Sequence, residues 1–120
     1  MTGHQPRNVH RVLDAVAEMW SPHVVAEVND YDVKVVNVDG DFVEHAHDET
    51  DELFLVLAGR LTIDLPDGAV TLDPYDVFTV PRGVRHRPRA EPGTRILILE
   101  PRGTVNTGDP ATGTTGVRLE

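Results

Sequence analysis

The chain has 120 residues and no cysteine, and its formal net charge is −9 at pH 7. This length allows one domain with a modest core, and the lack of cysteine excludes disulfides and thiolate metal sites. The negative charge makes nucleic acid, whose backbone is anionic, a poor partner. We expect no secretory signal in the polar first ten residues, and no apolar run approaches the roughly 20 residues of a membrane helix. The composition therefore predicts a cytoplasmic protein.

Residues 1–22 are expected to form an N-terminal arm and a short amphipathic helix. After a loose start, apolar residues recur at helical spacing from Val9 to Trp20. Asn8 is a suitable N-cap, and Ser21-Pro22 would end the helix. Because a helix of about twelve residues is marginal alone in water, we expect it to lie against an apolar surface.

Residues 23–107 have the pattern of many short strands separated by turns. Asn29-Asp30 and Asp39-Gly40 predict two early turns, and Asp73-Pro74-Tyr75-Asp76 fits a type I turn. The predicted strands are His23–Val28, Tyr31–Val38, Phe42–His47, Leu53–Ala58, Arg60–Leu65, Ala69–Leu72, Val77–Val80, Val84–Pro88 and Thr94–Leu99. Such a series is typical of an antiparallel sandwich or a small barrel. Residues 108–120, with few large apolar side chains, are expected to be a flexible tail.

Two of the predicted strands, Leu53–Ala58 and Ile96–Leu99, are apolar at every position rather than at alternate positions. A strand of this kind is buried on both faces. One helix can cover only part of the outer face of the sheet, so we expect a second subunit to cover the rest. The sequence thus predicts a homodimer.

The clearest chemical signal is a group of three histidines and one carboxylate. His45 and His47 are two positions apart, so on an extended strand they project from the same side. Glu52 follows after a polar turn, and His86 follows the turn Pro81-Arg82-Gly83. Three imidazoles and one carboxylate can hold a divalent metal and leave positions open for water or substrate. His45, His47, Glu52 and His86 are therefore the predicted metal ligands.

These residues also resemble a known family. The run Gly40…His45-Ala46-His47…Glu52…Gly59 is similar to the first motif of the cupin superfamily, and Pro81-Arg82-Gly83…His86 is similar to the second. A narrower likeness, carried by residues 48–54 and 104–109, is to small single-domain cupins of a mannose-6-phosphate isomerase-like group. The resemblance implies an all-β double-stranded β-helix, or jelly-roll barrel. It also implies one divalent transition metal, Fe, Mn, Ni, Co, Zn or Cu, held by the four predicted ligands.

Three positions depart from the two motifs. Gly40 is one residue closer to His45 than usual, Tyr75 stands where glycine is normal, and Ala90 stands where asparagine is frequent. The tyrosine is compatible with a type I turn, which needs no positive φ at that position. None of the three is a predicted ligand.

Several other residues compete for a role in the site. Asp51 is the alternative carboxylate, but strand alternation favours Glu52, which would share a face with Phe54 and Val56. Arg85, Arg87 and Arg89 alternate with His86 and are expected to face outward and pair with acids. His4, His10 and His23 are expected to be exposed or structural, with His23 the first substitute if the ligand set fails. Glu44 and Asp48 flank the histidines and could support the ligands or act as acid–base groups, but Glu44 alternates away from the metal face. The candidates for acid–base or substrate contacts are Tyr75, Tyr31 and Arg82.

Two kinds of function are compatible with these residues. The first is a small metal-dependent enzyme, either an isomerase, epimerase or lyase or a dioxygenase, acting on a small sugar-like or keto-acid substrate. The second is a non-catalytic module that binds or senses a small ligand in the same pocket. An interior with only apolar residues beside the ligands would favour the second, and the predicted inner face offers few acid–base groups besides the ligands.

Overall fold

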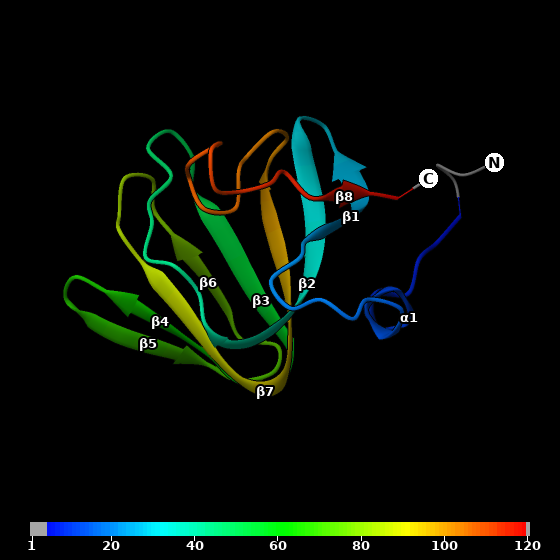
Figure 1. Ribbon diagram of the computed structural model, residues 1–120, viewed down its shortest axis with the longest axis horizontal. Helices are drawn as coiled ribbons and strands as arrows, with labels where there is room; N and C mark the ends of the chain where they lie inside the picture. The colour runs from blue at the N-terminus through cyan, green and yellow to red at the C-terminus, as the bar shows by residue number, and fades with distance from the viewer. Residues whose placement is uncertain (1–4, 120) are drawn as a thin grey trace.

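The chain folds into a β-barrel made of two facing layers of strands, which the computed structural model describes over residues 5–119 (Figure 1). The strand order is β5-β4-β7-β2-β1-β8, and β3 pairs with both β6 and β7. The elements are α1 (Val9–Asp14), β1 (His23–Val28), β2 (Tyr31–Asp41), β3 (Glu52–Ala58), β4 (Leu61–Leu65), β5 (Gly68–Leu72), β6 (Val77–Val80), β7 (Arg87–Pro101) and β8 (Val117–Arg118). This architecture confirms the predicted all-β jelly-roll class with a short N-terminal helix. Among residues 5–119, no helix is long and apolar enough to cross a membrane.

Strand β7 connects the two layers. Its first residues pair with β4, from Arg87 to Ala90, and its later residues pair with β2 on one side and β3 on the other. Between these parts lies Glu91-Pro92-Gly93, where Gly93 has a φ of +80°. The sequence predicted two separate strands here. The structure shows one bent strand, because residues on both sides of Glu91-Pro92-Gly93 are paired with neighbouring strands.

The barrel interior contains the larger core. Strand alternation turns one face of each strand inward, and the buried inward side chains are Val36, Val38, Phe54, Val56, Leu61, Ile63, Leu72, Val80 and Ile96. A second, smaller core lies outside the sheet, where α1 places Leu13 against Val25 and Val35. The helix therefore packs on an apolar sheet face, as its marginal length required.

Helix α1 is shorter than predicted. Asn8 caps its start by accepting a hydrogen bond from the Arg11 amide, but the helix ends at Asp14 instead of continuing to Trp20. The buried side-chain amide of Asn37 donates to the carbonyls of Leu13 and Val16, which satisfies backbone groups left free at this end. Trp20 has a φ of 60° and points into the barrel. It was predicted as part of the helix, but it belongs to the barrel interior.

Three predicted local features are wrong in detail. Phe42–His47 is not a regular strand: the pairing register shifts by one residue between Phe42–Pro88 and His45–His86, and only an isolated bridge remains. Asp39-Gly40 is not a turn, because β2 continues through Gly40 with a bulge. Tyr75 has a φ of 71°, so its turn is not type I. This conformation favours glycine, which is the residue that the resembled motif has there.

The C-terminal segment lies against the barrel through residue 119. The backbone amide of Val117 donates to the Pro22 carbonyl, and β8 pairs with β1 in parallel. Arg118 forms ion pairs with Asp32, which is fully buried, and with Glu27. These contacts describe where the segment lies. The flexibility expected for residues 108–120, and the domain boundaries at 22 and 107, remain predictions.

We expect Gly59→Ala to lower the free energy of unfolding by about 2–4 kcal/mol, because two effects combine. Gly59 has a φ of +80°, and an added Cβ would collide with the backbone and side chain of Thr94. Gly93→Ala is the matched control, because Gly93 has the same φ but open space around it. The control should lose only about 1–2 kcal/mol from backbone strain. Urea unfolding of both variants measures the difference, and equal losses would contradict the close approach at Gly59.

Candidate metal centre

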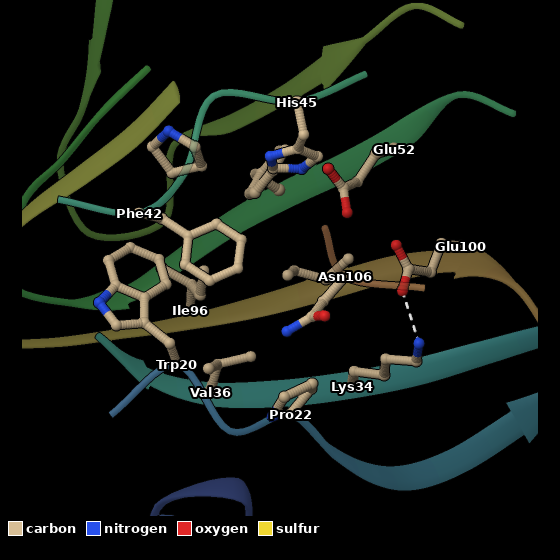
Figure 2. A pocket seen from close by; sticks show the side chains of 13 residues that line it. Trp20, Pro22, Lys34, Val36, Phe42, His45, Glu52, Ile96, Glu100 and Asn106 are labelled. Carbon is tan, nitrogen blue, oxygen red and sulfur yellow. Dashed lines mark hydrogen bonds and ion pairs between the residues drawn. The ribbon is translucent and has the colours of Figure 1, made fainter. Parts of the chain in front are cut away.

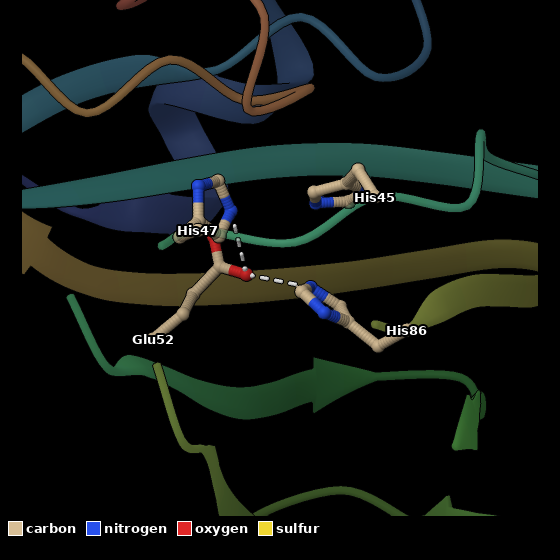
Figure 3. Close-up of side chains that lie close together, drawn as sticks. All are labelled: His45, His47, Glu52 and His86. Carbon is tan, nitrogen blue, oxygen red and sulfur yellow. Dashed lines mark hydrogen bonds and ion pairs between the residues drawn. The ribbon is translucent and has the colours of Figure 1, made fainter. Parts of the chain in front are cut away.

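Four buried side chains meet at one end of the barrel interior. His45, His47, Glu52 and His86 each offer one possible ligand atom, and these atoms all lie within 4.8 Å of one another (Figure 3). Their exposed fractions range from 1% to 7%. The structure thus brings together the four residues that the sequence named as metal ligands.

The backbone positions each of the four. His45 and His86 form an isolated antiparallel bridge, with both backbone hydrogen bonds between them made. His47 accepts a hydrogen bond from the Gly83 amide through its carbonyl, which ties it to the same turn. Glu52 opens β3 and shares the inward face with Phe54, as alternation predicted. Asp51 is exposed and accepts a hydrogen bond from the Arg82 amide instead, so it supports the turn before His86.

The hydrogen bonds of the rings leave lone pairs facing one another. Nδ1 of His45 is 2.9 Å from the Val43 carbonyl, and Nδ1 of His86 is 3.0 Å from the Val84 carbonyl. A carbonyl only accepts, so both Nδ1 atoms carry the proton and the neutral rings present bare Nε2 atoms. Nε2 of His45 is buried without a hydrogen-bond partner among the described residues. Nε2 of His86 lies 3.2 Å from Glu52 Oε1.

The unprotonated Nε2 of His86 and the Oε1 of Glu52 are both acceptors, and they lie 3.2 Å apart. Two acceptors at this distance are stable only when they share a cation, either a proton or a metal ion. The electrostatics also favour the forms that bind metals. Burial lowers the pKa of His45 to about 4, so its ring is neutral near pH 7. Burial alone would raise the pKa of Glu52, but contacts with His47 and His86 outweigh it and hold that pKa below its usual range. A neutral imidazole at His45 beside an ionised carboxylate at Glu52 matches the protonation states that a divalent metal requires of its ligands. The residues present therefore fit the implied metal.

A small cavity lies beside the cluster (Figure 2). His45 and Glu52 form part of its wall, so a metal held by the cluster would face this space. Most of the remaining wall is apolar: Trp20, Pro22, Val36, Phe42, Phe54, Pro88, Ile96 and Ile98. The rings of Trp20 and Phe42 stack with centroids 4.8 Å apart, and the indole N–H donates to the Asp39 carbonyl, which fixes the ring. The cavity thus has an aromatic side next to the cluster.

Three polar side chains that the sequence reading did not assign to the site also line this cavity. Lys34 and Glu100 are buried, with Lys34 Nζ 2.6 Å from Glu100 Oε2, and Asn106 reaches in from the C-terminal segment. The sequence predicted few acid–base groups on the inner face besides the ligands, and the structure places Lys34 and Glu100 there. Alternation contained the signal, because Lys34 shares a face with Val36, and Glu100 shares one with Ile96 and Ile98.

Burial and the neighbouring Glu52 raise the pKa of Glu100 to about 9, in spite of the contact with Lys34. The metal-free protein thus holds this side chain mainly in its neutral form near pH 7. Lys34 then donates to a carboxyl group that has one oxygen, Oε1, left over. That oxygen is buried without a hydrogen-bond partner among the described residues.

The other candidate residues lie away from the cavity. Tyr75 is 76% exposed in the turn between β5 and β6, and Tyr31 is on the outer face of the sheet. Arg82 is exposed beside Asp51. Arg85 pairs with Glu44, while Arg87 and Arg89 pair with Asp64, so the outward arginines bind acids as predicted. His10 contacts Arg95, His23 contacts the Ser21 carbonyl, and His4 lies outside the described residues.

Comparison with known proteins gives a consistent picture. The cupin domain family profile matches residues 32–101. Protein YdbB of Bacillus subtilis, described as uncharacterized, is 34% identical over 95 residues, which is 78% of this chain and 84% of that protein. A 3-hydroxyanthranilate 3,4-dioxygenase of Burkholderia cenocepacia is 33% identical over 114 residues, and the match spans 85% of this chain but 64% of that enzyme. A cupin-2 domain containing protein of Shewanella frigidimarina has a similar structure, with a TM-score of 0.77 and 42% identity over 80% of this chain and 94% of that chain.

Proposed function

This chain belongs to the cupin domain family, and from that premise we propose that it is a metal-dependent enzyme, of the dioxygenase kind, acting on a small hydroxylated aromatic molecule. The observation that carries the proposal is the shared wall: His45 and Glu52 belong both to the four-residue cluster and to the lining of the cavity. A small molecule in the cavity would therefore contact the metal directly. A divalent metal bound here would supply a Lewis acid and, if redox-active, a centre for O₂ chemistry.

The walls of the cavity favour an aromatic body over a sugar. Each buried hydroxyl of a sugar needs a hydrogen-bond partner, or its desolvation counts against binding. Eight of the thirteen side chains that line the cavity are apolar and offer no such partner. A flat ring can lie against Trp20 and Phe42 and needs few polar contacts. The similarity to a 3-hydroxyanthranilate 3,4-dioxygenase supports the same substrate class.

The residues of the chain have separate roles in this proposal. His45, His47, Glu52 and His86 hold the metal, and the apolar walls keep bulk water from the bound molecule. Lys34, Glu100 and Asn106 provide polar groups at the cavity wall, which argues against a purely apolar binding module. We assign the chain to the small cupins of the mannose-6-phosphate isomerase-like group on residues 48–54 and 104–109, but we carry over no isomerase activity from that name. The cytoplasmic location remains a prediction from sequence.

Oxygen consumption tests the proposal. Protein loaded anaerobically with Fe²⁺ would be mixed with oxygenated buffer that contains catechol, hydroquinone or 3-hydroxyanthranilate, one compound in each sample. An oxygen electrode would follow the uptake of O₂. We expect uptake that depends on one of these compounds and falls by about 100-fold or more in His47→Ala. Fully loaded protein that binds these compounds but consumes no O₂ with any of them would contradict dioxygenase activity.

We also infer that two copies associate through the outer face of the sheet. Leu53 lies opposite Leu99 and Leu55 opposite Val77, so the four side chains share the outer face. Val77 is 60% exposed and the leucines are half-buried, because α1 covers only neighbouring residues such as Leu57 and Leu97. An apolar surface of this kind on a barrel this small is explained by a partner subunit.

Light scattering should therefore give a mass near twice the 13.2 kDa of one chain. Val77→Asp should shift the protein toward monomer, because a carboxylate would be buried without a partner at the interface. Ala69→Asp, at an exposed position of β5, is the control and should leave the mass unchanged. A wild-type mass of one chain at micromolar concentration would exclude this dimer.

A further inference from the structure

The cavity beside the metal cluster is too small, in this conformation, for the class of substrate proposed above. Its volume is about 30 Å³, whereas a cavity that holds benzene measures roughly 150 Å³. The four ligand residues are at most 7% exposed, so solvent barely reaches them. Some part of the wall must therefore move before a metal ion or an aromatic molecule can enter.

Residues 103–117, here called the C-terminal loop, have both ends fixed at one place (orange to red in Figure 1). At the start, Arg102 Nη2 is 2.8 Å from Glu27 Oε1, and at the end, Arg118 Nη1 is 2.6 Å from Glu27 Oε2. Arg118 also pairs with the buried Asp32 at 3.0 Å, and β8 pairs with β1 beside it. A surface loop of this length with neighbouring ends is an Ω-loop, a type that frequently has a functional role.

The middle of the loop is held together by its own contacts. The Asn106 amide donates to the Thr114 carbonyl at 3.0 Å, and Asn106 Oδ1 accepts from the Thr114 amide at 2.9 Å. Within the described part of the chain, residues 105–116 form hydrogen bonds only with one another, and none of their side chains is buried. This stretch can therefore leave the barrel as a unit without breaking a hydrogen bond to it.

Two residues of the loop lie against the cavity and the metal centre. Asn106 forms part of the cavity wall, where Figure 2 shows it among the lining side chains. Gly108 packs so closely on Ala46 that an added Cβ would collide with the Ala46 carbonyl oxygen. Ala46 lies between the ligands His45 and His47 in the chain. The loop thus contacts both the cavity and the segment that carries two of the four ligands.

We propose that the C-terminal loop is a lid that controls entry to the metal centre and its cavity. It opens about its fixed ends at Arg102 and Arg118, and it closes when Gly108 packs on Ala46. Opening removes Asn106 from the wall and uncovers the ligand segment, while closure keeps bulk water from the bound molecule. The proposal rests on the metal-dependent function proposed above, because it treats the four-residue cluster as a metal site.

The exchange of Zn²⁺ tests the lid without a substrate or redox chemistry. Loss of Zn²⁺ from loaded protein to an excess of a chromogenic chelator gives the release rate, and competition with the same chelator gives the affinity. A lid slows uptake and release by the same factor, because each step needs the open state. A variant that cannot close should therefore release Zn²⁺ faster and keep its affinity.

Gly108→Ala is the first variant, because the new methyl group would collide with Ala46 and hold the lid open. We expect Zn²⁺ release at least about tenfold faster than in the wild-type protein, with an affinity within about threefold. Gly103→Ala is the matched control. Gly103 lies in the same loop and has a φ of +87°, close to the +74° of Gly108, but nothing lies within 4 Å of an added Cβ. This control should release Zn²⁺ at the wild-type rate.

A second variant removes the tip of the lid. Asn106 and Thr114 are paired, so residues 107–113 can be replaced by an Asn-Gly turn that joins these two residues directly. The shortened loop no longer reaches Ala46. It should also release Zn²⁺ at least about tenfold faster, with an affinity within about threefold of the wild-type value.

The outcomes separate the lid from the proposed function. Wild-type release rates in both variants would overturn the lid and leave the metal site standing. Faster release with an equal loss of affinity would also overturn it, because the loop would then support the ligands instead of controlling access. If Ala46 shifts to accept the methyl group of Gly108→Ala, the tip deletion decides the question. Failure of the wild-type protein to take up Zn²⁺ would instead overturn the proposed function.

Discussion

His47→Ala is expected to reduce the metal content of the purified protein from about one equivalent to roughly a tenth or less, while the barrel remains folded. The reason is geometric. His47 supplies one of the four ligand atoms that lie within 4.8 Å of one another, and its Nε2 is 3.4 Å from Glu52 Oε1. Alanine at this position leaves three ligands and a gap open to water. Elemental analysis of protein purified without chelators measures the loss.

The matched control for this prediction is His23→Ala. His23 is only half-buried, and its Nδ1 contacts the Ser21 carbonyl, away from the cluster. It should keep the metal content of the wild-type protein. Circular dichroism should show the same β-sheet signal for both variants. Undiminished metal in folded His47→Ala would remove His47 from the ligand set.

The second large effect is expected at the buried pair of Lys34 and Glu100. Glu100→Met should lower the free energy of unfolding by about 3–5 kcal/mol, because it leaves the ammonium group of Lys34 buried with only the Thr104 carbonyl as a partner. The double variant Lys34→Met/Glu100→Met should regain most of that loss, because no ammonium group is left buried without its partner. Urea unfolding of metal-free protein, followed by the fluorescence of the single tryptophan, measures all three. A double variant as unstable as Glu100→Met would contradict this account.

Lys34→Met should behave differently, because the carboxyl group of Glu100 can stay protonated and neutral. Burial and Glu52 raise the pKa of Glu100 to about 9 in the folded chain, whereas the unfolded value is the ordinary 4.5. The folded state therefore holds a proton that the unfolded chain releases above pH 4.5. Without the opposing charge of Lys34 this pKa rises further, so the stability of metal-free Lys34→Met should fall as the pH rises from about 5 to 9. Stability that rose with pH over this range would contradict a neutral Glu100.

The predictions that succeeded rest on patterns that repeat along the chain. The hairpin at Asn29-Asp30 and the strands from Leu53 to Val80 appear at or within one residue of their predicted positions, because apolar runs and turn residues mark both ends. Alternation also placed Glu52 on the inward face with Phe54, and Asp51 on the outside. Because side chains alternate between the two faces of a strand, the inward and outward positions can be predicted without knowing which strands are neighbours.

The failures occur where partners distant in sequence decide the structure. The side-chain amide of Asn37 binds the carbonyls at the end of α1, and Trp20 lines the barrel interior. Local periodicity contains neither contact. His45 pairs with His86 by a single bridge, so the segment before it looks like a strand in sequence only. The sequence did not indicate Lys34 and Glu100, because Lys34 follows the charged Asp32 in a strand of mixed pattern and Glu100 lies just beyond the predicted strand Thr94–Leu99. Their burial is explained only by the contact between them, across 66 residues of chain.

The metal content of the wild-type protein is the most direct test of the central claim. Protein would be expressed in medium containing all first-row transition metals, purified without chelators and analysed for each element against protein concentration. We expect close to one divalent transition metal per chain, removable by a chelator and restored by adding the metal back. Folded protein that contains no metal, and takes up none when Fe²⁺, Mn²⁺ or Zn²⁺ is supplied, would contradict the assignment of His45, His47, Glu52 and His86 as a metal site.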